Sequence, residues 1–425
     1  MKRLSWLLMM AGILIGQVYQ TALKAAQLPV LAGTVAYVGS DQNVYTLSFP
    51  DNRSVALTND ADGRRLYRWP TWSTDGRLAY FASVRQGSSL STETYVSPDG
   101  RAPGRRIHSA PFEFLNYAFW APQNCADGSG CRHLALLLNN SSQPELFVRL
   151  VSDSESGSTE RIIGSGRPFY FSWSPDGRRM LWQRNNQTLD IYDATMGQLL
   201  RTLELVPGWF QAPAWSPIDD RLLFGILNAD EETTDLVVLA NDSVQRLATA
   251  VRGRVAFSWS PNGNYIAYAD HDGPLRVIDA NSGELISRSP TGGIVAFFWS
   301  PDSSQIAYVT PSLPPSSFSV QAGFSAKTAL YVQDAAGVSW SVLDVKTGAN
   351  RRFGAFLPTQ EMVYFLVYFD QFAQSHRLWS PDSRYLVYAE ITPNGDPTIS
   401  LLDTKRNDVV PVSIADGPLA IWSFE

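Results

Sequence analysis

The sequence has little charge, and it has very few lysines, cysteines and histidines. Of its 425 residues, 17% are charged, against roughly 25% in an ordinary globular domain. Only five of the 34 basic residues are Lys, and the net charge of −6 argues against a nucleic-acid-binding surface. The 44% of hydrophobic residues is ample for a large core, so the composition argues against a disordered chain.

The two cysteines, Cys125 and Cys131, bracket a short Gly- and Asp-rich segment, NCADGSGC. A local disulfide between them is feasible and would suit an oxidising compartment. Two thiols alone make half a zinc site, so a metal site is the weaker interpretation. Two free thiols remain the other alternative, because their geometry is not known from sequence.

The chain has one long apolar run, at its start. Met1-Lys2-Arg3 precede LSWLLMMAGILIGQVYQTAL, with no charge before Lys24. A basic start followed by an apolar run indicates a secretory signal peptide or an uncleaved membrane anchor over residues 1–26. Both remain open, and both predict an extracytoplasmic location: secreted, periplasmic, or anchored and facing outside. No cysteine follows the run, which excludes a lipoprotein anchor.

A tryptophan followed by a turn sequence recurs along the rest of the chain. Successive tryptophans are 40 to 53 residues apart, except for one step of 80. The motifs are WSTDG, WAPQN, WSPDG, WSPID, WSPNG, WSPDS, WSPDS and WSFE, with their tryptophans at Trp72, Trp120, Trp173, Trp215, Trp259, Trp299, Trp379 and Trp422. A repeat of this period is typical of a solenoid or a propeller.

Each repeat reads as two hairpins. A first strand ends at Trp-Ser, Pro-Asp-Gly makes the turn, and an alternating apolar strand such as Ile266-Ala267-Tyr268 follows. Asp193, Asp279 and Asp344 each precede a Gly by four residues, which predicts the second hairpin turn with the Asp as a local cap. Four strands in about 40–45 residues make a propeller blade.

The sequence therefore predicts an all-β fold, a single β-propeller over residues 31–425. The N-terminal unit around Val35-Ala36-Tyr37 lacks a Trp strand, and Leu419–Trp422 would supply it, closing the ring. Eight Trp anchors predict eight blades. Seven is the alternative, if the irregular unit near residues 84–118 is not a blade.

The repeated WSPDG motif, followed by an Ile-Ala-Tyr strand, resembles the TolB-type and dipeptidyl-peptidase-type β-propeller repeats, a WD-like class. The resemblance spans almost all of residues 31–425 and implies the fold, whereas members of this class bind partners, gate peptidases or cleave carbohydrates. No G-x-S-x-G nucleophile motif occurs. His108, His133, His271 and His376 occupy dissimilar repeat positions, which disfavours the histidine-held metal of the lyases.

The recurring tryptophans are interpreted as packing residues between blades, because a position shared by every repeat serves the repeat. Most long insertions fall in connections that open on one face of such a ring, which we call the loop-rich face: residues 84–94, 105–118, 204–213, 311–330 and 354–377. Such elaboration is where repeat folds tend to bind.

Two of these segments are unusually aromatic and supply the candidate partner-binding residues. These are Trp209, Phe210, Tyr364, Phe365, Tyr368, Phe369 and Phe372. Helical spacing would place Phe365, Phe369 and Phe372 on one face. The alternative for residues 357–374 is an insert that folds over the mouth of the ring and buries its own apolar side.

The residues favour a non-catalytic, exported β-propeller, with no catalytic residue, cofactor or metal site, that binds a protein or peptide partner through the loop-rich face. We expect the protein to be a monomeric ring that does not bind nucleic acid. We expect it to contact a membrane only through the N-terminal segment, if that segment is not cleaved. The alternative function is a carbohydrate-active lyase or hydrolase with its site at the central channel. A third is a propeller that only braces an envelope assembly.

Overall fold

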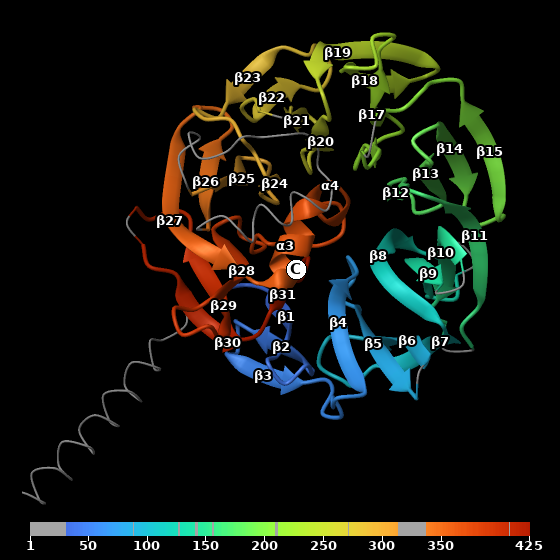
Figure 1. Ribbon diagram of the computed structural model, residues 1–425, viewed down its shortest axis with the longest axis vertical. Helices are drawn as coiled ribbons and strands as arrows, with labels where there is room; N and C mark the ends of the chain where they lie inside the picture. Colours follow the sequence, from blue (N-terminus) through green and yellow to red (C-terminus); the bar gives the residue numbers. More distant parts are fainter. Residues whose placement is uncertain are drawn as a thin grey trace, which may run out of the picture.

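The computed structural model describes residues 31–87, 89–125, 128–140, 143–154, 157–208, 211–270, 272–312, 337–407 and 409–425. The predicted leader, residues 1–26, lies outside these residues. The described chain is all-β, and its sheets are arranged around a ring, as a β-propeller (Figure 1). Two short helices, α3 (Gln360–Val367) and α4 (Phe369–Phe372), lie near the centre of the ring.

Six of the sheets have four antiparallel strands each. The first three are β31 (Leu419–Trp422) with β1 (Thr34–Val38), β2 (Val44–Ser48) and β3 (Arg53–Ala56); β4 (Arg65–Trp72), β5 (Leu78–Gln86), β6 (Ser89–Ser97) and β7 (Arg105–Pro111); and β8 (Glu113–Asn124), β9 (Arg132–Asn140), β10 (Gln143–Ser152) and β11 (Glu160–Gly166). The next three are β12 (Phe169–Trp173), β13 (Arg179–Arg184), β14 (Thr188–Asp193) and β15 (Gln198–Leu203); β16 (Ala214–Trp215), β17 (Leu222–Leu227), β18 (Thr233–Ala240) and β19 (Ser243–Arg252); and β20 (Ala256–Trp259), β21 (Tyr265–Ala269), β22 (Arg276–Asp279) and β23 (Leu285–Arg288).

The remaining sheet has seven strands. They are β24 (Ala296–Trp299), β25 (Gln305–Pro311), β26 (Val338–Asp344), β27 (Asn350–Pro358), β28 (Tyr385–Ile391), β29 (Pro397–Asp403) and β30 (Val412–Asp416). β27 and β28 are joined by two residue pairs, Leu357 with Ile391 and Pro358 with Glu390. Trp379, which precedes β28 in the chain, forms an isolated antiparallel bridge with Leu386 of that strand.

The C-terminal strand pairs with the N-terminal one. β31 lies antiparallel to β1, with Val35 opposite Trp422 and Val38 opposite Leu419. The Ser423 amide donates to the carbonyl of Thr34 and extends this pairing at 2.8 Å. Residues at the two ends of the described chain thus share one sheet.

The turn after each repeat tryptophan is held by its own side chains. In WSPDG, the Ser174 hydroxyl donates to Asp176 at 2.5 Å and accepts the Arg179 amide at 2.9 Å. In the second hairpin, Asp193 accepts the amides of Thr195 and Met196 at 2.8 and 2.7 Å. The local capping role predicted for these aspartates is confirmed, and it leaves their oxygens engaged within the turn.

Two segments predicted as insertions are instead strands. Residues 84–94 continue β5 into β6, with Val84 paired to Ser91, and residues 105–118 form β7 and the start of β8. These strands are longer than the corresponding strands of most other repeats. Cross-strand pairing therefore continues at positions where the spacing of the repeat predicted a loop. The irregular unit near 84–118 therefore contributes two strands to the β4–β7 sheet.

Candidate functional site

A helical segment occupies the centre of the ring. Residues 359–376, which we call the plug, follow β27 and contain α3 and α4 (Figure 1). The Thr359 hydroxyl caps α3 by accepting the Met362 amide at 3.2 Å, and it donates to the carbonyl of Pro418 at 2.6 Å. The plug connects β27 to β28 and leaves the sheet at the end of β27, so it enters the channel from the loop-rich face.

Polar side chains fasten the plug to the innermost strands. The Gln371 amide group spans the Phe171 backbone, accepting from its N–H at 3.0 Å and donating to its carbonyl at 2.7 Å. The Tyr117 hydroxyl donates to the Gln371 carbonyl at 3.0 Å. Asp370 accepts the Ala212 amide at 2.9 Å. These bonds tie one short segment to β8, to β12 and to the connection that precedes β16.

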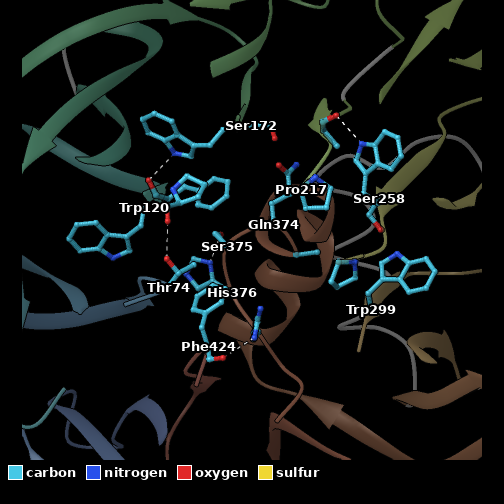
Figure 2. Close-up of a pocket in the computed structure, with 18 of the residues that line it drawn as sticks. Thr74, Trp120, Ser172, Pro217, Ser258, Trp299, Gln374, Ser375, His376 and Phe424 are labelled. Carbon is cyan, nitrogen blue, oxygen red and sulfur yellow. Dashed lines mark hydrogen bonds between the residues drawn. The ribbon is translucent and has the colours of Figure 1, made fainter. Parts of the chain in front are cut away.

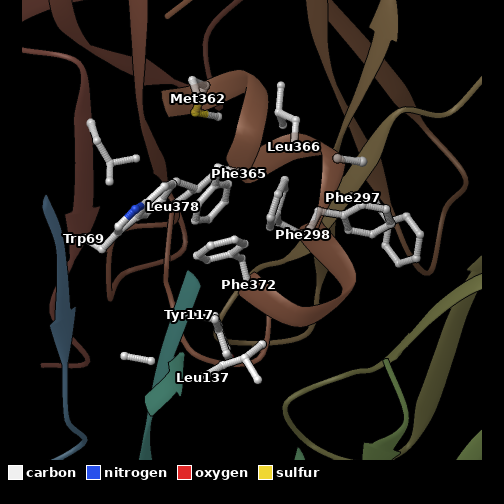
Figure 3. Packing of buried hydrophobic residues seen from close by; sticks show 14 of the residues in the cluster. Trp69, Tyr117, Leu137, Phe297, Phe298, Met362, Phe365, Leu366, Phe372 and Leu378 are labelled. Atoms are coloured by element: carbon white, nitrogen blue, oxygen red, sulfur yellow. The ribbon is translucent and has the colours of Figure 1, made fainter. Parts of the chain in front are cut away.

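The apolar side of the plug is core. Phe365, Phe369 and Phe372 are all buried, and they lie on one side of the two helices, as helical spacing predicts. Figure 3 shows Phe365 and Phe372 packed with Phe298, beside Trp69 and Tyr117. The structure therefore leaves these three phenylalanines unavailable to a partner that binds this conformation.

The remaining aromatic candidates fall in different places. Tyr364 is part-buried and packs on Trp69, and Tyr368 is 38% exposed. Trp209 and Phe210 lie outside the described residues. Among the described candidates, Tyr368 alone presents a large exposed surface.

The innermost strand β4 is distorted where it meets the plug. Its register shifts between Arg68 and Thr71, and Trp69 has a φ of 50°, a region that bulky residues rarely adopt. The bulge turns the Trp69 ring onto Phe372, with centroids 5.0 Å apart. Backbone strain at this point is thus compensated by packing against the plug.

Below the plug, the channel keeps a cavity of about 490 Å³. Its wall comes from the turn sequences of successive repeats, so it opens on the face of the WSPDG turns, which we call the turn face. Figure 2 shows Gln374, Ser375 and His376 at its centre, surrounded by Trp120, Ser172, Pro217, Ser258 and Trp299. Other repeat residues in the wall are Trp72, Trp173, Pro175, Trp215, Trp259, Pro261, Pro301 and Trp379.

The repeat tryptophans of this wall also join neighbouring blades. Four indole N–H groups donate to the backbone carbonyl that precedes the tryptophan of the previous repeat. These bonds run from Trp120 to Thr71 at 2.9 Å, Trp173 to Phe119 at 3.3 Å, Trp259 to Ala214 at 3.2 Å and Trp379 to Phe298 at 3.0 Å. The interpretation of the tryptophans as packing residues between blades is therefore confirmed.

Two ionisable residues of the plug's end line the cavity. His376 is buried, with Ser375 at 2.6 Å from Nδ1 and Thr71 at 3.1 Å from Nε2, and burial lowers its pKa to about 3. Arg377 is part-buried, and burial lowers its pKa to about 10. At neutral pH the histidine is therefore uncharged and the arginine charged.

Sequence reasoning did not single out Arg377, Gln374 or Ser375. All three lie in the segment QFAQSHRL, which spans the end of the plug and the residues directly after it. They belong to no repeat position, so the repeat pattern carried no signal for them. The available signal was the presence of His and Arg shortly before a WSPD motif, inside one of the two long inter-blade connections that are also aromatic.

The two cysteines are joined by a disulfide, Cys125–Cys131, with Cα atoms 5.3 Å apart. Within the described part of the chain, no group of three His, Cys, Asp or Glu residues is arranged to hold a metal ion. Among the same residues, no helix is long and apolar enough to cross a membrane.

No family model matches the chain, and no curated protein matches it. It is similar to a solved structure described as a eukaryotic initiation factor, with 11% sequence identity, 92% of this chain and 98% of that chain covered, and a TM-score of 0.53. It is also similar to the C-terminal WD40 domain of Sif2, with 12% identity, 80% and 84% covered, and a TM-score of 0.47. For TolB from Acinetobacter baumannii, the identity is 14%, the coverage 81% of both chains, and the TM-score 0.38. At these identities a likeness concerns the fold alone.

Proposed function

We propose that this protein is a non-catalytic, exported β-propeller that binds a protein or peptide partner through its loop-rich face. The proposal rests on exposed apolar side chains in the connections between blades, a set separate from Met196, Ile218 and Val410, which the repeated turns expose on the turn face. Phe112, Val206 and Leu357 are 47%, 55% and 43% exposed, and each belongs to a connection or strand end that leads from one blade to the next. Tyr368 of the plug joins them on this face. Contiguous exposed apolar patches are typical of partner contacts, so the proposal requires that these side chains meet one partner together.

The chemistry of the channel supports binding rather than turnover. A general base must be able to take up a proton near neutral pH. His376 has both ring nitrogens engaged and a pKa of about 3, so it stays neutral without a free lone pair. The described residues that line the cavity include no Asp or Glu, whereas sugar hydrolysis ordinarily requires a pair of carboxyl groups.

We further propose eight blades, closed by the C-terminal strand. The seven-stranded sheet then represents two blades that touch along β27 and β28, with Trp379 as the shortened inner strand of the second. The pairing of β31 with β1 supports the closure. A TolB-type or WD-like repeat family remains part of this proposal, on the strength of the repeated motif.

An extracytoplasmic location is also proposed. It rests on the basic and apolar start of the sequence. The disulfide between Cys125 and Cys131 is consistent with an oxidising compartment.

The experiment places a photo-crosslinking residue at Tyr368, at Leu357 and at Val410 in the native host. Val410 is the control, because it is 82% exposed but lies between the third and fourth strands of its blade, on the turn face. We expect one and the same partner from the two loop-face positions and none from Val410. The purified partner should then lose affinity by about tenfold or more for Leu357→Asp or Tyr368→Asp. Equal yields from all three positions, or no adduct from any, contradict the proposal.

A further inference from the structure

The guanidinium of Arg377 lies in the wall of the turn-face cavity and is only partly satisfied. One N–H donates to the Phe424 carbonyl at 3.2 Å, and the guanidinium centre lies 4.2 Å from the centroid of the Phe424 ring. Phe424 lines the same cavity. An arginine side chain carries five N–H donors, so this single bond leaves most of its fork unused.

No carboxylate of the described residues compensates this charge. Burial is the sole cause that lowers the pKa of Arg377, with no opposing contribution from a nearby acid. A buried charge without a counter-charge is unfavourable and is normally paired. The cavity thus contains a cation that an incoming anion would stabilise.

The rest of the cavity favours a flat apolar body. Tryptophan rings and proline rings from successive repeats form its sides, and its volume of about 490 Å³ lies within the range of small-ligand sites. Gln374 adds a neutral polar group at its centre (Figure 2), whereas the buried Ser375 hydroxyl is engaged by Tyr117 and His376. His376 is neutral, so Arg377 is the single charged group among the described lining residues.

We infer that the turn-face cavity binds a monoanionic carboxylate attached to a flat apolar group, with the carboxylate on Arg377. The planar guanidinium matches a carboxylate in shape and can donate two parallel bonds to it. A phosphate dianion fits less well, because its two negative charges would face a single positive charge, that of Arg377. The carboxylate could come from a free organic acid or from the C-terminus of a peptide. The site lies opposite the loop-rich face, so it stands or falls independently of the proposed function.

The test measures binding calorimetrically with three probes on the full chain. They are 3-phenylpropionate, its amide 3-phenylpropanamide, and the tripeptide N-acetyl-Gly-Gly-Phe with a free carboxylate. We expect binding of at least one acid in the millimolar range or tighter, and at least about tenfold weaker binding of the amide, as expected for loss of a charge-assisted hydrogen bond. Tighter binding of the tripeptide assigns a peptide C-terminus, and tighter binding of 3-phenylpropionate assigns a free acid.

Variants locate the carboxylate. Arg377→Gln should remove the preference for acid over amide, and Arg377→Lys should keep part of it, because Lys retains the charge without the fork. Arg254→Gln is the matched control, a part-buried arginine beside Tyr368 and Asp370 on the other side of the plug. The inference is overturned if neither acid binds, if acid and amide bind equally, or if Arg254→Gln has the effect expected of Arg377→Gln. The comparison of acid with amide uses the unaltered protein, so it decides the question even if Arg377→Gln does not fold.

Discussion

The two mouths of the channel are built from different parts of the repeat and have different characters. On the loop-rich face, one inter-blade connection turns inward as the plug and buries Phe365, Phe369 and Phe372 against the inner strands. On the turn face, the same short hairpin recurs in every repeat, and the tryptophan and proline rings leave a cavity. The repeated turns thus leave a cavity at the ring axis on the turn face, whereas a single irregular insertion fills the axis on the loop-rich face.

The largest effect is expected from the core of the plug. Phe372→Ala removes a ring buried between Trp69, Tyr117 and Phe365, and it should lower the free energy of unfolding by about 3–5 kcal/mol. Tyr368→Ala, on the exposed side of the same segment, should cost about 1 kcal/mol or less. Urea unfolding of the two variants measures the difference. Equal losses would mean that the plug is not part of the core.

The repeat allowed much of this architecture to be predicted. Turn formation at Ser174-Pro175-Asp176 depends on neighbours in sequence, so the hairpins and the capping aspartates were predictable from one unit. Helical spacing correctly grouped Phe365, Phe369 and Phe372, but sequence left open whether that face met a partner or the protein's own core. Whether this face meets a partner or the core depends on long-range contacts, such as the one between Gln371 and Phe171, which are 200 residues apart in the sequence. A local sequence pattern does not contain that information.

A smaller effect should distinguish the tryptophans that line the turn face. The Trp120 indole donates to the Thr71 carbonyl, whereas the buried N–H of Trp215 has no partner among the described residues. Both Trp→Phe changes shrink a buried ring, and Trp215→Phe also weakens the contact of its ring with the Arg179 guanidinium at 4.9 Å, so the difference between them is a lower bound on the hydrogen bond. Trp120→Phe should cost about 1–2 kcal/mol more than Trp215→Phe in the free energy of unfolding. Equal costs would mean that the indole hydrogen bond does not help to hold neighbouring blades together.

A further prediction concerns the pH dependence of the plug's attachment. Burial raises the pKa of Asp370 to about 6, from an ordinary value of 3.8. Between these values the folded chain keeps a proton that the unfolded chain has released, so stability falls as the pH rises from about 4 to 6. Asp370→Asn cannot ionise, and its stability relative to the unaltered protein should therefore rise through that window and level off above pH 6.

Asp230 supplies the control of opposite sign. Hydrogen bonds from the Thr233 amide and hydroxyl lower the pKa of this turn carboxylate, so its contribution is present above the unfolded pKa and is lost as the pH falls. Because this loss occurs below the ordinary value of 3.8, Asp230→Asn should differ from the unaltered protein by a constant amount between pH 4 and pH 7, and the difference should shrink at lower pH. Thermal melts of both variants from about pH 2 to pH 7 cover both windows, and a flat difference for Asp370→Asn between pH 4 and pH 6 would contradict the burial that raises the pKa of its carboxyl group.

Solvent access to two cysteines placed in the plug tests the contrast between the two mouths most directly. Val363→Cys lies on the buried side of α3, and Ala373→Cys lines the turn-face cavity. Both native cysteines are in the disulfide, so a maleimide reports the new thiols alone. We predict that Ala373→Cys is labelled roughly 100-fold faster or more, because Val363→Cys becomes accessible only when the plug opens. Equal labelling rates, or faster labelling of Val363→Cys, would contradict a channel that is filled on the loop-rich face and hollow on the turn face.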